Sequence, residues 1–241
     1  MKRSHTYLYT FLIVFLIFRP CSDYACTVFY MYKNGKVLGG SNEDWKDPNT
    51  RFWFYPASEG KHAWVKFGFS GGFPQAGMND SGIFWDGTSN PWQGMPYSEE
   101  NKQFYEGALM QKVMEESSSI SEVTGIFDLY YCQDQYRGQY LVGGANGLSV
   151  IIDGDYYHHN DKSYQVLTNF HQSNPALGGH PCSRYNTATD MLENCDTLTE
   201  YYAGSVLSAT CQNGSFPTQY SLLFDPQLRQ IYLFYYQNYE E

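Results

Sequence analysis

Hydrophobic and polar residues alternate along much of the chain, a pattern that predicts short β-strands. Residues 26–32 alternate and are rich in Val, Phe and Tyr, and the Asn34-Gly35 pair after them favours a tight two-residue turn. Residues 37–41 are therefore the expected return strand. Further strands are expected at residues 52–56, 63–69, 82–87, 139–143, 147–153, 155–159, 164–168, 219–225 and 229–236, with a turn at residues 78–82.

Two pairs of segments have helical periodicity instead. Residues 101–119 and 121–131 form the first expected pair, with Ser121 as N-cap, and residues 184–194 and 198–209 form the second. Strands precede, separate and follow these pairs, and no repeat or linker divides the chain. This order predicts one α+β domain in which helix pairs pack on the outer faces of antiparallel sheets.

The start of the chain has the pattern of an export signal. Two basic residues precede an apolar run at residues 7–18, which is too short to cross a bilayer and has the length typical of a signal-peptide core. Ala25 provides a small residue before the expected cleavage point. We therefore expect residues 1–25 to be a signal peptide and residues 26–241 to be a mature domain that is secreted or held in another exported compartment, periplasmic or lysosome-like. An uncleaved N-terminal anchor is the alternative.

Composition and charge narrow the classes of function. The 241 residues are 42% hydrophobic and 18% aromatic, which suffices for a core and excludes a wholly disordered chain. Lys and Arg number 15 against 25 Asp and Glu, for a net charge of −10. Removal of residues 1–25 takes three cations and one acid and makes the net charge −12. Because such a surface repels phosphate backbones, nucleic-acid binding is not expected.

The chain contains six cysteines, of which five would remain after cleavage. In an exported protein this number predicts one free thiol beside up to two disulfides, formed among Cys132, Cys182, Cys195 and Cys211. These four can pair in three ways, and the sequence does not choose among them. No C-x-x-C motif occurs and no His stands at zinc-finger spacing, so a structural zinc site is not expected.

The expected register of the first hairpin places acidic residues beside a cysteine. If Asn34-Gly35 form the turn, Cys26 faces Glu43 and lies next to Asp44. A cysteine at the start of a mature chain carries a free α-amine, with a pKa of about 8, that can accept the thiol proton. A carboxylate such as Asp44 can hold that amine in place. The alternative is a buried or disulfide-bonded cysteine beside a solvated acidic turn.

Short motifs succeed one another along the chain in a recognisable order. They are Cys-Thr at residues 26–27, Gly-Ser-Asn-Glu-Asp-Trp at 40–45, Gly-Met-Asn-Asp-Ser-Gly-Ile at 77–83, Val-Leu-Thr-Asn at 166–169, Ser-Arg-Tyr at 183–185, and a last hairpin at 220–225 and 231–233. Together they resemble the motifs of N-terminal-nucleophile (Ntn) cysteine hydrolases of the penicillin V acylase and bile salt hydrolase type. The sequence looks nearest to the acyl-CoA:6-aminopenicillanate acyltransferase-like (carcinine hydrolase-like) group of these linear amide hydrolases.

The resemblance implies a fold and a set of catalytic residues. The fold would be a four-layer αββα sandwich, with two antiparallel sheets stacked between helix pairs. Cys26 would be the nucleophile and, through its amine, the base, and Asp44 would be the catalytic aspartate. Asn169 matches the asparagine of the oxyanion hole, and Arg184 matches an arginine that lies near the nucleophile and lowers its thiol pKa.

The resemblance also suggests residues around the substrate. A backbone N–H from residues 88–90 would be the second oxyanion donor, which makes Ser89 and Asn90 candidate substrate-binding residues. His171, shortly after the oxyanion-hole asparagine, is a candidate for the pocket wall. Ser41 stands where the bile-salt branch has arginine. This departure weakens any specific prediction of bile-salt hydrolysis and leaves a catalytically inactive protein open.

These features together predict an exported amidase that cleaves the linear amide bond of an N-acylated small molecule. The Cys26 thiolate would attack the carbonyl carbon, the amine would leave, and water would hydrolyse the thioester. If a second amine replaces water, the same site is an acyltransferase. Neither reaction is expected to require a cofactor or a metal. The alternative of a different class is a secreted, inactive binding protein with Cys26 in a disulfide. Stable membrane insertion after cleavage is not expected, and a homo-oligomer stays open.

Overall fold

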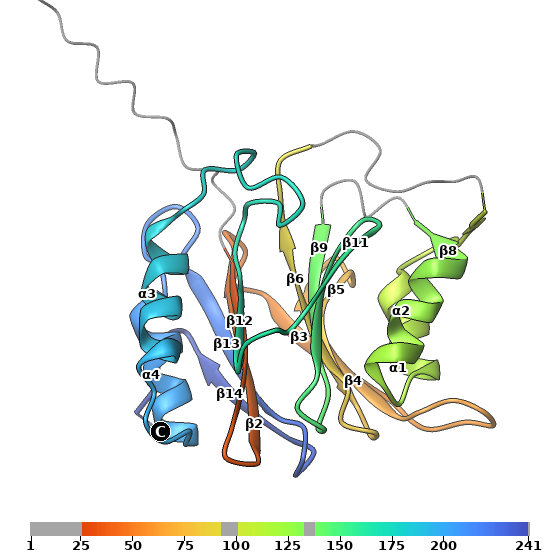
Figure 1. Ribbon diagram of the computed structural model, residues 1–241, viewed down its shortest axis with the longest axis horizontal. Helices are drawn as coiled ribbons and strands as arrows, with labels where there is room; N and C mark the ends of the chain where they lie inside the picture. Colours follow the sequence, from red (N-terminus) through yellow and green to blue (C-terminus); the bar gives the residue numbers. More distant parts are fainter. Residues whose placement is uncertain (1–25, 93–100, 133–137, 241) are drawn as a thin grey trace, which may run out of the picture.

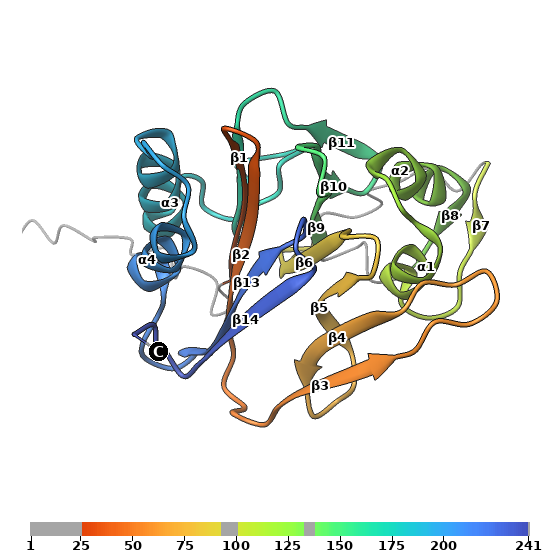
Figure 2. The same cartoon turned by 90° about the horizontal axis from the view of Figure 1, so that it is seen from below.

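Two antiparallel β-sheets lie face to face, and a pair of helices covers the outer face of each (Figures 1 and 2). The computed structural model describes residues 26–92, 101–132 and 138–240, so the predicted signal peptide lies outside the described residues. The four layers confirm the predicted αββα sandwich. One outer layer consists of α3 (Ser183–Glu193) and α4 (Glu200–Thr210), and the other of α1 (Leu109–Glu116) and α2 (Ile120–Leu129).

The first sheet brings the two ends of the described chain together. Among the described residues it has five strands, which in spatial order are β12 (Tyr164–Leu167), β1 (Thr27–Lys33), β2 (Lys36–Asp44), β13 (Thr218–Asp225) and β14 (Gln230–Tyr235). The neighbouring pairs are antiparallel throughout. Because β1 lies between β12 and β2, its first residues are held on both sides.

The second sheet has seven strands within the described ranges. In spatial order these are β11 (Tyr156–His159), β10 (Ser149–Asp153), β9 (Gly138–Gly143), β6 (Phe84–Ser89), β5 (Pro74–Asn79), β4 (Trp64–Phe69) and β3 (Thr50–Tyr55). A separate two-stranded parallel ribbon pairs β7 (Gln103–Phe104) with β8 (Tyr130–Tyr131).

The first hairpin has the predicted register. Asn34 and Gly35 form its turn with φ angles of 52° and 86°, the left-handed conformation that a tight hairpin turn requires. The pairing continues to the end of the hairpin, where Thr27 lies opposite Asn42. Cys26, one residue earlier, therefore lies beside β2 at the edge where its acidic residues stand.

Apolar clusters fill the three interfaces between the four layers. Along β1, Val28 and Tyr30 face the second sheet, whereas Phe29 and Met31 face α3 and α4. This alternation is the period-two pattern of a strand that is buried on both faces. A third cluster joins the second sheet to α1 and α2 and includes Trp64, Trp85, Leu109, Val113, Phe127 and Val142.

The first helix pair begins and ends differently from the prediction. The helix expected from residue 101 begins only at Leu109, because residues 103–104 pair with β8 and Gly107 adopts a φ of 111°. The next helix begins at Ile120, after Ser119. The Ser119 hydroxyl accepts a hydrogen bond from the Glu122 N–H, so Ser119 and not Ser121 is the N-cap.

One strand of the second sheet was not predicted. β5 occupies residues that contain Pro74 and Gly77, both of which disfavour strands. The predicted turn therefore begins only after Asn79. The Asn79 Nδ2 donates to the carbonyls of Met114 and Ser117, at 3.0 and 2.7 Å, which ties this turn to the end of α1.

The structure contradicts the predicted disulfides. Cys182, Cys195 and Cys211 are all free thiols, so none of the three predicted pairings is formed. The reason is their placement at separate helix ends. Cys182 caps the start of α3 and Cys195 follows its end, roughly 18 Å away along the helix axis, whereas disulfides join Cα atoms within about 7 Å. Cys211 is the C-cap of α4.

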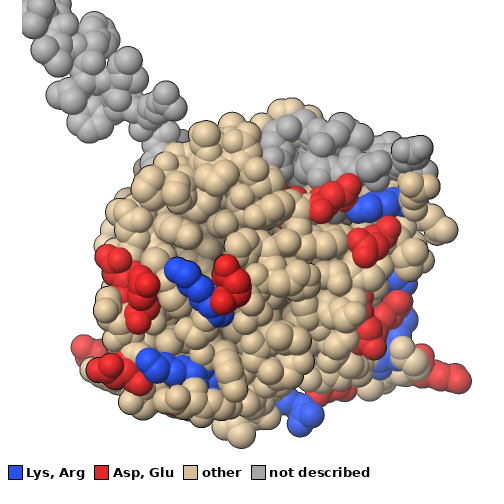
Figure 3. Space-filling view, viewed as in Figure 1, with Lys and Arg blue, Asp and Glu red and all other residues tan. Residues whose placement is uncertain are grey.

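Charged side chains lie mainly toward the margins of the face shown in Figure 3, and its central surface carries few. No helix within the described residues is long and apolar enough to span a membrane. Nor do three His, Cys, Asp or Glu side chains of the described residues converge as a metal site would require.

Phe84 packs closely between the two sheets. Its ring is stacked on Phe224 at a centroid distance of 4.8 Å and on Tyr30 at 6.2 Å. Gly39 and Gly143 lie against this ring so closely that a Cβ at either position would overlap it. The two glycines therefore set how closely the sheets approach beneath the middle of β1, where Gly39 pairs with Tyr30.

We expect Gly39→Ala to lower the free energy of unfolding by about 1–3 kcal/mol, because the added methyl group displaces the Phe84 ring. Gly125→Ala is the control, since a Cβ at Gly125 in α2 meets nothing within 4 Å. It should stabilise the protein by up to about 1 kcal/mol through helix propensity. Urea unfolding measures the change in the free energy of unfolding for each variant. Equal changes in the two variants would contradict the close packing of Gly39 against Phe84.

Candidate active site

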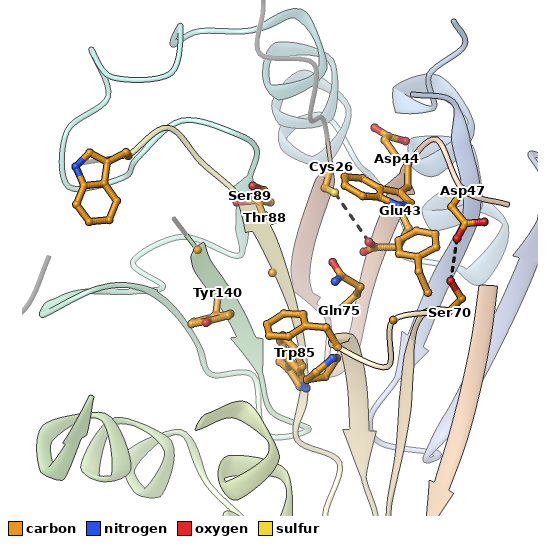
Figure 4. Close-up of a pocket in the computed structure, with 18 residues that line it drawn as sticks. Cys26, Glu43, Asp44, Asp47, Ser70, Gln75, Trp85, Thr88, Ser89 and Tyr140 are labelled. Atoms are coloured by element: carbon orange, nitrogen blue, oxygen red, sulfur yellow. Dashed lines mark hydrogen bonds between the residues drawn. The ribbon is translucent and has the colours of Figure 1, made fainter. Parts of the chain in front are cut away.

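A cavity of about 720 Å³ lies where the ends of β1 and β2 approach the second sheet, and Figure 4 shows the residues that line it. This volume is in the range of small-molecule sites. Its wall combines aromatic rings, three acids and the thiol of Cys26. The lining residues are Cys26, Glu43, Asp44, Trp45, Asp47, Phe69, Ser70, Gly71, Phe73, Pro74, Gln75, Trp85, Gly87, Thr88, Ser89, Trp92, Gly138 and Tyr140.

Cys26 is a free, largely buried thiol at the start of β1. Its backbone nitrogen donates a hydrogen bond to Asn169 Oδ1 at 2.8 Å. Its sulfur lies 3.9 Å from Glu43 Oε2, the contact drawn in Figure 4. Burial raises the pKa of the thiol well above its usual value, and the charges of Glu43 and Asp44 raise it further.

Arg184 contacts the backbone of Cys26 and not its sulfur. It is the second residue of α3, and its Nη1 donates to the Cys26 carbonyl and, at 2.9 Å, to Thr27 Oγ1. Its Nη2 donates to Asn169 Oδ1 at 3.1 Å. Arg184 thus lies beside Cys26, and these hydrogen bonds reach the Cys26 backbone, Thr27 and Asn169 but not the thiol whose pKa the resemblance implied it would lower.

Asn169 connects the two sheets at the cavity. It comes after β12, and its Oδ1 accepts from both Cys26 and Arg184. Its Nδ2 donates to the Ser89 carbonyl, at the end of β6, at 2.7 Å. The amide orientation is consistent, because two donors meet the oxygen and an acceptor meets the nitrogen. One of the two Nδ2 hydrogens is committed to Ser89.

Asp44 lies at the end of β2 with both carboxylate oxygens bound. Oδ1 accepts from Thr218 Oγ1 at 2.5 Å, and Oδ2 accepts from Gln212 Nε2 at 2.9 Å. Burial raises the pKa of Asp44 to about 7, although these hydrogen bonds and the Arg184 charge oppose the shift. The backbone N–H of Asp44 is directed at the Cys26 sulfur and lowers the pKa of the thiol.

A pair of buried acids lies beneath the thiol. Glu43 on β2 is 1% exposed and Asp86 on β6 is fully buried, and their carboxyl groups lie close enough across the two sheets to affect each other's pKa. Burial raises the pKa of both groups, and the charge of Asp86 raises that of Glu43 further. The pair therefore holds at least one proton near neutral pH, since two carboxylates cannot both ionise at such a site.

Two of the three candidate substrate residues do not line the cavity. Ser89 lines it, whereas Asn90 Oδ1 accepts a hydrogen bond from the Thr88 hydroxyl at 2.8 Å. His171 is buried, with its Nδ1 2.9 Å from Asp153 Oδ1 and its Nε2 2.7 Å from the Pro91 carbonyl. Both ring nitrogens of His171 are thus used within the fold, and the prediction that it forms the pocket wall was wrong.

Sequence reasoning missed the acid pair for an identifiable reason. The hairpin register placed Glu43 opposite Cys26, but the family resemblance implied that the catalytic acid is Asp44, so no role was assigned to Glu43. Asp86 interrupts the apolar run Ile83-Phe84-Trp85 in a strand that was predicted. A carboxylate inside a buried strand is costly unless it is partnered or protonated. That interruption was the available signal.

No protein-family model matches the sequence, and no curated protein sequence matches it. The structure is similar to penicillin V acylase from Agrobacterium tumefaciens, with a TM-score of 0.68 and 16% sequence identity over 86% of this chain and 82% of that chain. It is also similar to an arginine-to-leucine variant and a cysteine-to-alanine mutant of conjugated bile acid hydrolase from Clostridium perfringens. Their TM-scores are 0.65 and 0.67, each at 16% identity, over 87% and 88% of this chain and 92% and 89% of theirs.

At this level of identity the likeness shows the fold. The chain shares the fold of penicillin V acylase and conjugated bile acid hydrolase, in agreement with the predicted four-layer αββα sandwich. Its nearest subgroup and the roles of its site residues stay predictions.

The buried acid pair makes stability depend on pH. A carboxyl whose pKa is raised by folding binds its proton more tightly in the folded state, so unfolding becomes easier as pH rises above the unfolded pKa of about 4.3. We expect the melting temperature to fall between about pH 5 and pH 8, and Glu43→Gln to reduce this fall. The exposed Glu59, changed to Gln, is the control. An unchanged pH dependence in Glu43→Gln would contradict the placement of the pair.

Proposed function

We propose that this chain is an exported cysteine Ntn amidase that cleaves the linear amide bond of an N-acylated small molecule. The observation that supports it best is the setting of Cys26. A free thiol lines a cavity of about 720 Å³ in an Ntn-hydrolase fold, and its own nitrogen and carbonyl are held by Asn169 and Arg184. The similar folds of penicillin V acylase and conjugated bile acid hydrolase agree with amide chemistry.

The proposed reaction begins with removal of residues 1–25, which converts the Cys26 nitrogen into an α-amine. The amine accepts the thiol proton, and the thiolate forms a bond to the amide carbonyl carbon. When the tetrahedral intermediate collapses, the C–N bond breaks and the α-ammonium returns the proton to the leaving amine. A water molecule, deprotonated by the same amine, then attacks the thioester, and the acid and the free thiol are released.

Asn169 and Arg184 would keep the nucleophile in place through these steps. Asn169 Oδ1, 2.8 Å from the Cys26 nitrogen, would accept a hydrogen bond from the α-amine. This is the contact that sequence reasoning assigned to Asp44, whose carboxylate is instead bound by Thr218 and Gln212. The second Nδ2 hydrogen of Asn169 and a backbone N–H of residues 88–90 would stabilise the oxyanion.

There are two alternatives to a hydrolase. In the first, the thioester forms but is not hydrolysed, and in the second, no thioester forms. An acyltransferase would use the same residues, with a second amine in place of water. An inactive secreted binding protein was the alternative with Cys26 in a disulfide. The free thiol of Cys26 and its place in the cavity favour the enzyme over that alternative.

The proposal requires that Cys26 be both the first residue and the nucleophile. In secreted protein, N-terminal sequencing should read Cys-Thr-Val, and the preparation should hydrolyse members of a panel that contains penicillin V, glycine-conjugated bile acids and N-acyl nitroanilides. Cys26→Ser should abolish nearly all turnover, whereas Cys211→Ser, outside the cavity lining, should retain it. Active protein with any residue ahead of Cys26 would exclude this mechanism.

Asn169 should affect the reaction more than the fold. Asn169→Ala should lower kcat and kcat/KM together, by about 10²–10³-fold, because a donor used in the transition state is lost. Asn160→Ala is the control, since the Asn160 side chain also binds backbone groups through both its oxygen and its nitrogen, at Ser149 and Gly147, but does not contact Cys26.

The control variant should lower the melting temperature without lowering kcat. If Asn169→Ala shows that same behaviour, Asn169 is a structural residue and the oxyanion hole lacks its proposed side-chain donor.

A further inference from the structure

The charged residues that line the cavity are all acidic. Among the described residues that line it, three are acidic, Glu43, Asp44 and Asp47, and none is Lys, Arg or His. Arg184 lies close by, but its guanidinium is committed to Cys26, Thr27 and Asn169. An anionic substrate would therefore meet no available counter-charge at this wall.

Asp47 is the acid best placed to act as a fixed negative charge at neutral pH. Its Oδ1 accepts from the Asn49 backbone N–H at 2.9 Å, and its Oδ2 accepts from the Ser70 hydroxyl at 2.9 Å. These hydrogen bonds lower the pKa of Asp47. The nearby charge of Arg51 also lowers this pKa, but by less than the hydrogen bonds do. Lys66 does not compensate it, because its Nζ binds the Gly72 carbonyl and lies 4.3 Å from the centre of the Trp53 ring.

Aromatic residues line the cavity from the same chain segments as Asp47 and its partner Ser70. Trp45 is two residues before Asp47 and Phe69 directly precedes Ser70, and their ring centres are 6.0 Å apart; Phe73 also lines the cavity. Aromatic faces together with a carboxylate form a favourable environment for an organic cation.

The other part of the wall is apolar. In Figure 4, Cys26 and Glu43 lie between Asp47 with Ser70 on one side and Tyr140 on the other. Trp85 and Tyr140 meet edge to face there, with ring centres 5.8 Å apart. The thiol thus lies between a wall that suits an apolar group and a wall that suits a cation.

A second polar feature of the cavity lacks a partner. Glu43 lines it and is 1% exposed, yet its Oε1 has no hydrogen-bond partner among the described residues. A buried polar atom of this kind is costly unless a bound molecule or water satisfies it. Its position beside the thiol marks the place where a polar part of the substrate, such as the amide itself, would lie.

We propose that the substrate joins an apolar, aromatic or aliphatic group to an organic cation through the scissile amide, and that Asp47 selects the cation. This inference rests on the proposed amidase function. The net charge of −12 on the expected mature domain would also favour the approach of a cation over that of an anion.

The test uses mature protein and phenylacetyl amides of three short amines that differ only in the end group, which is an ammonium, a hydroxyl or a carboxylate. We expect kcat/KM to fall in that order, with the ammonium roughly tenfold above the carboxylate at low salt and less at high salt. Asp47→Asn should lower kcat/KM for the ammonium compound about five- to tenfold and leave the hydroxyl compound within about twofold. Asp161→Asn, an exposed acid outside the cavity lining, should change neither.

A binding measurement separates this inference from the amidase proposal. A phenylalkylammonium ion should protect Cys26 from iodoacetamide better than the matching phenylalkyl carboxylate, and Asp47→Asn should remove the difference. Equal protection, or faster turnover of the carboxylate amide, would overturn the charge preference while leaving an amidase intact. Protection by the ammonium ion without hydrolysis of any amide would overturn the amidase and retain the cation site.

Discussion

The hydrogen bond between the Cys26 nitrogen and Asn169 Oδ1, at 2.8 Å, is the contact on which the site depends. It joins the start of β1 to the end of β12, and Arg184 at the start of α3 reinforces it from the other side. These bonds engage the backbone of Cys26 only. The thiol is therefore left to face the cavity, and its position is set by three elements that are far apart in the sequence.

The same contact relates the two states of the proposed enzyme. With a peptide bond ahead of Cys26, its nitrogen carries no charge, and burial among carboxyl groups keeps the pKa of the thiol high. In the proposed mature form the same nitrogen is an α-amine beside Asn169, and it becomes an ammonium when it accepts the thiol proton. A cation next to a thiol favours the thiolate. The acidic surroundings of Cys26 would then hold the ammonium as well as disfavour the thiolate, so processing would change the reactivity of the thiol without moving it.

Much of this arrangement could be read from the sequence because it depends on local patterns. The Asn34-Gly35 turn determines the register of the first hairpin, and that register alone brings Cys26 to Glu43. Alternation along the strands and the two helix pairs indicated the layers. Short motifs brought Asn169 and Arg184 to the same site, although they lie more than a hundred residues after Cys26.

The features that sequence reasoning missed depend on contacts between distant segments. The pairing of Glu43 with Asp86 forms only where the two sheets meet, and no local pattern reports that meeting. From its place in the sequence, His171 was a candidate for the pocket wall. In the fold its two ring nitrogens instead contact Asp153 and the Pro91 carbonyl. The predicted disulfides came from counting cysteines, whereas the helix ends keep the thiols apart.

The central claim is that a chain beginning at Cys26 forms a thioester through this thiol. Mature protein mixed with an excess of a hydrolysed amide, quenched in acid within a fraction of a turnover and digested, tests it most directly by mass spectrometry. The account predicts that the peptide beginning at Cys26 gains the mass of the acyl group and that hydroxylamine removes it. Turnover with an unmodified Cys26 peptide, or with the acyl group on another residue, would contradict it.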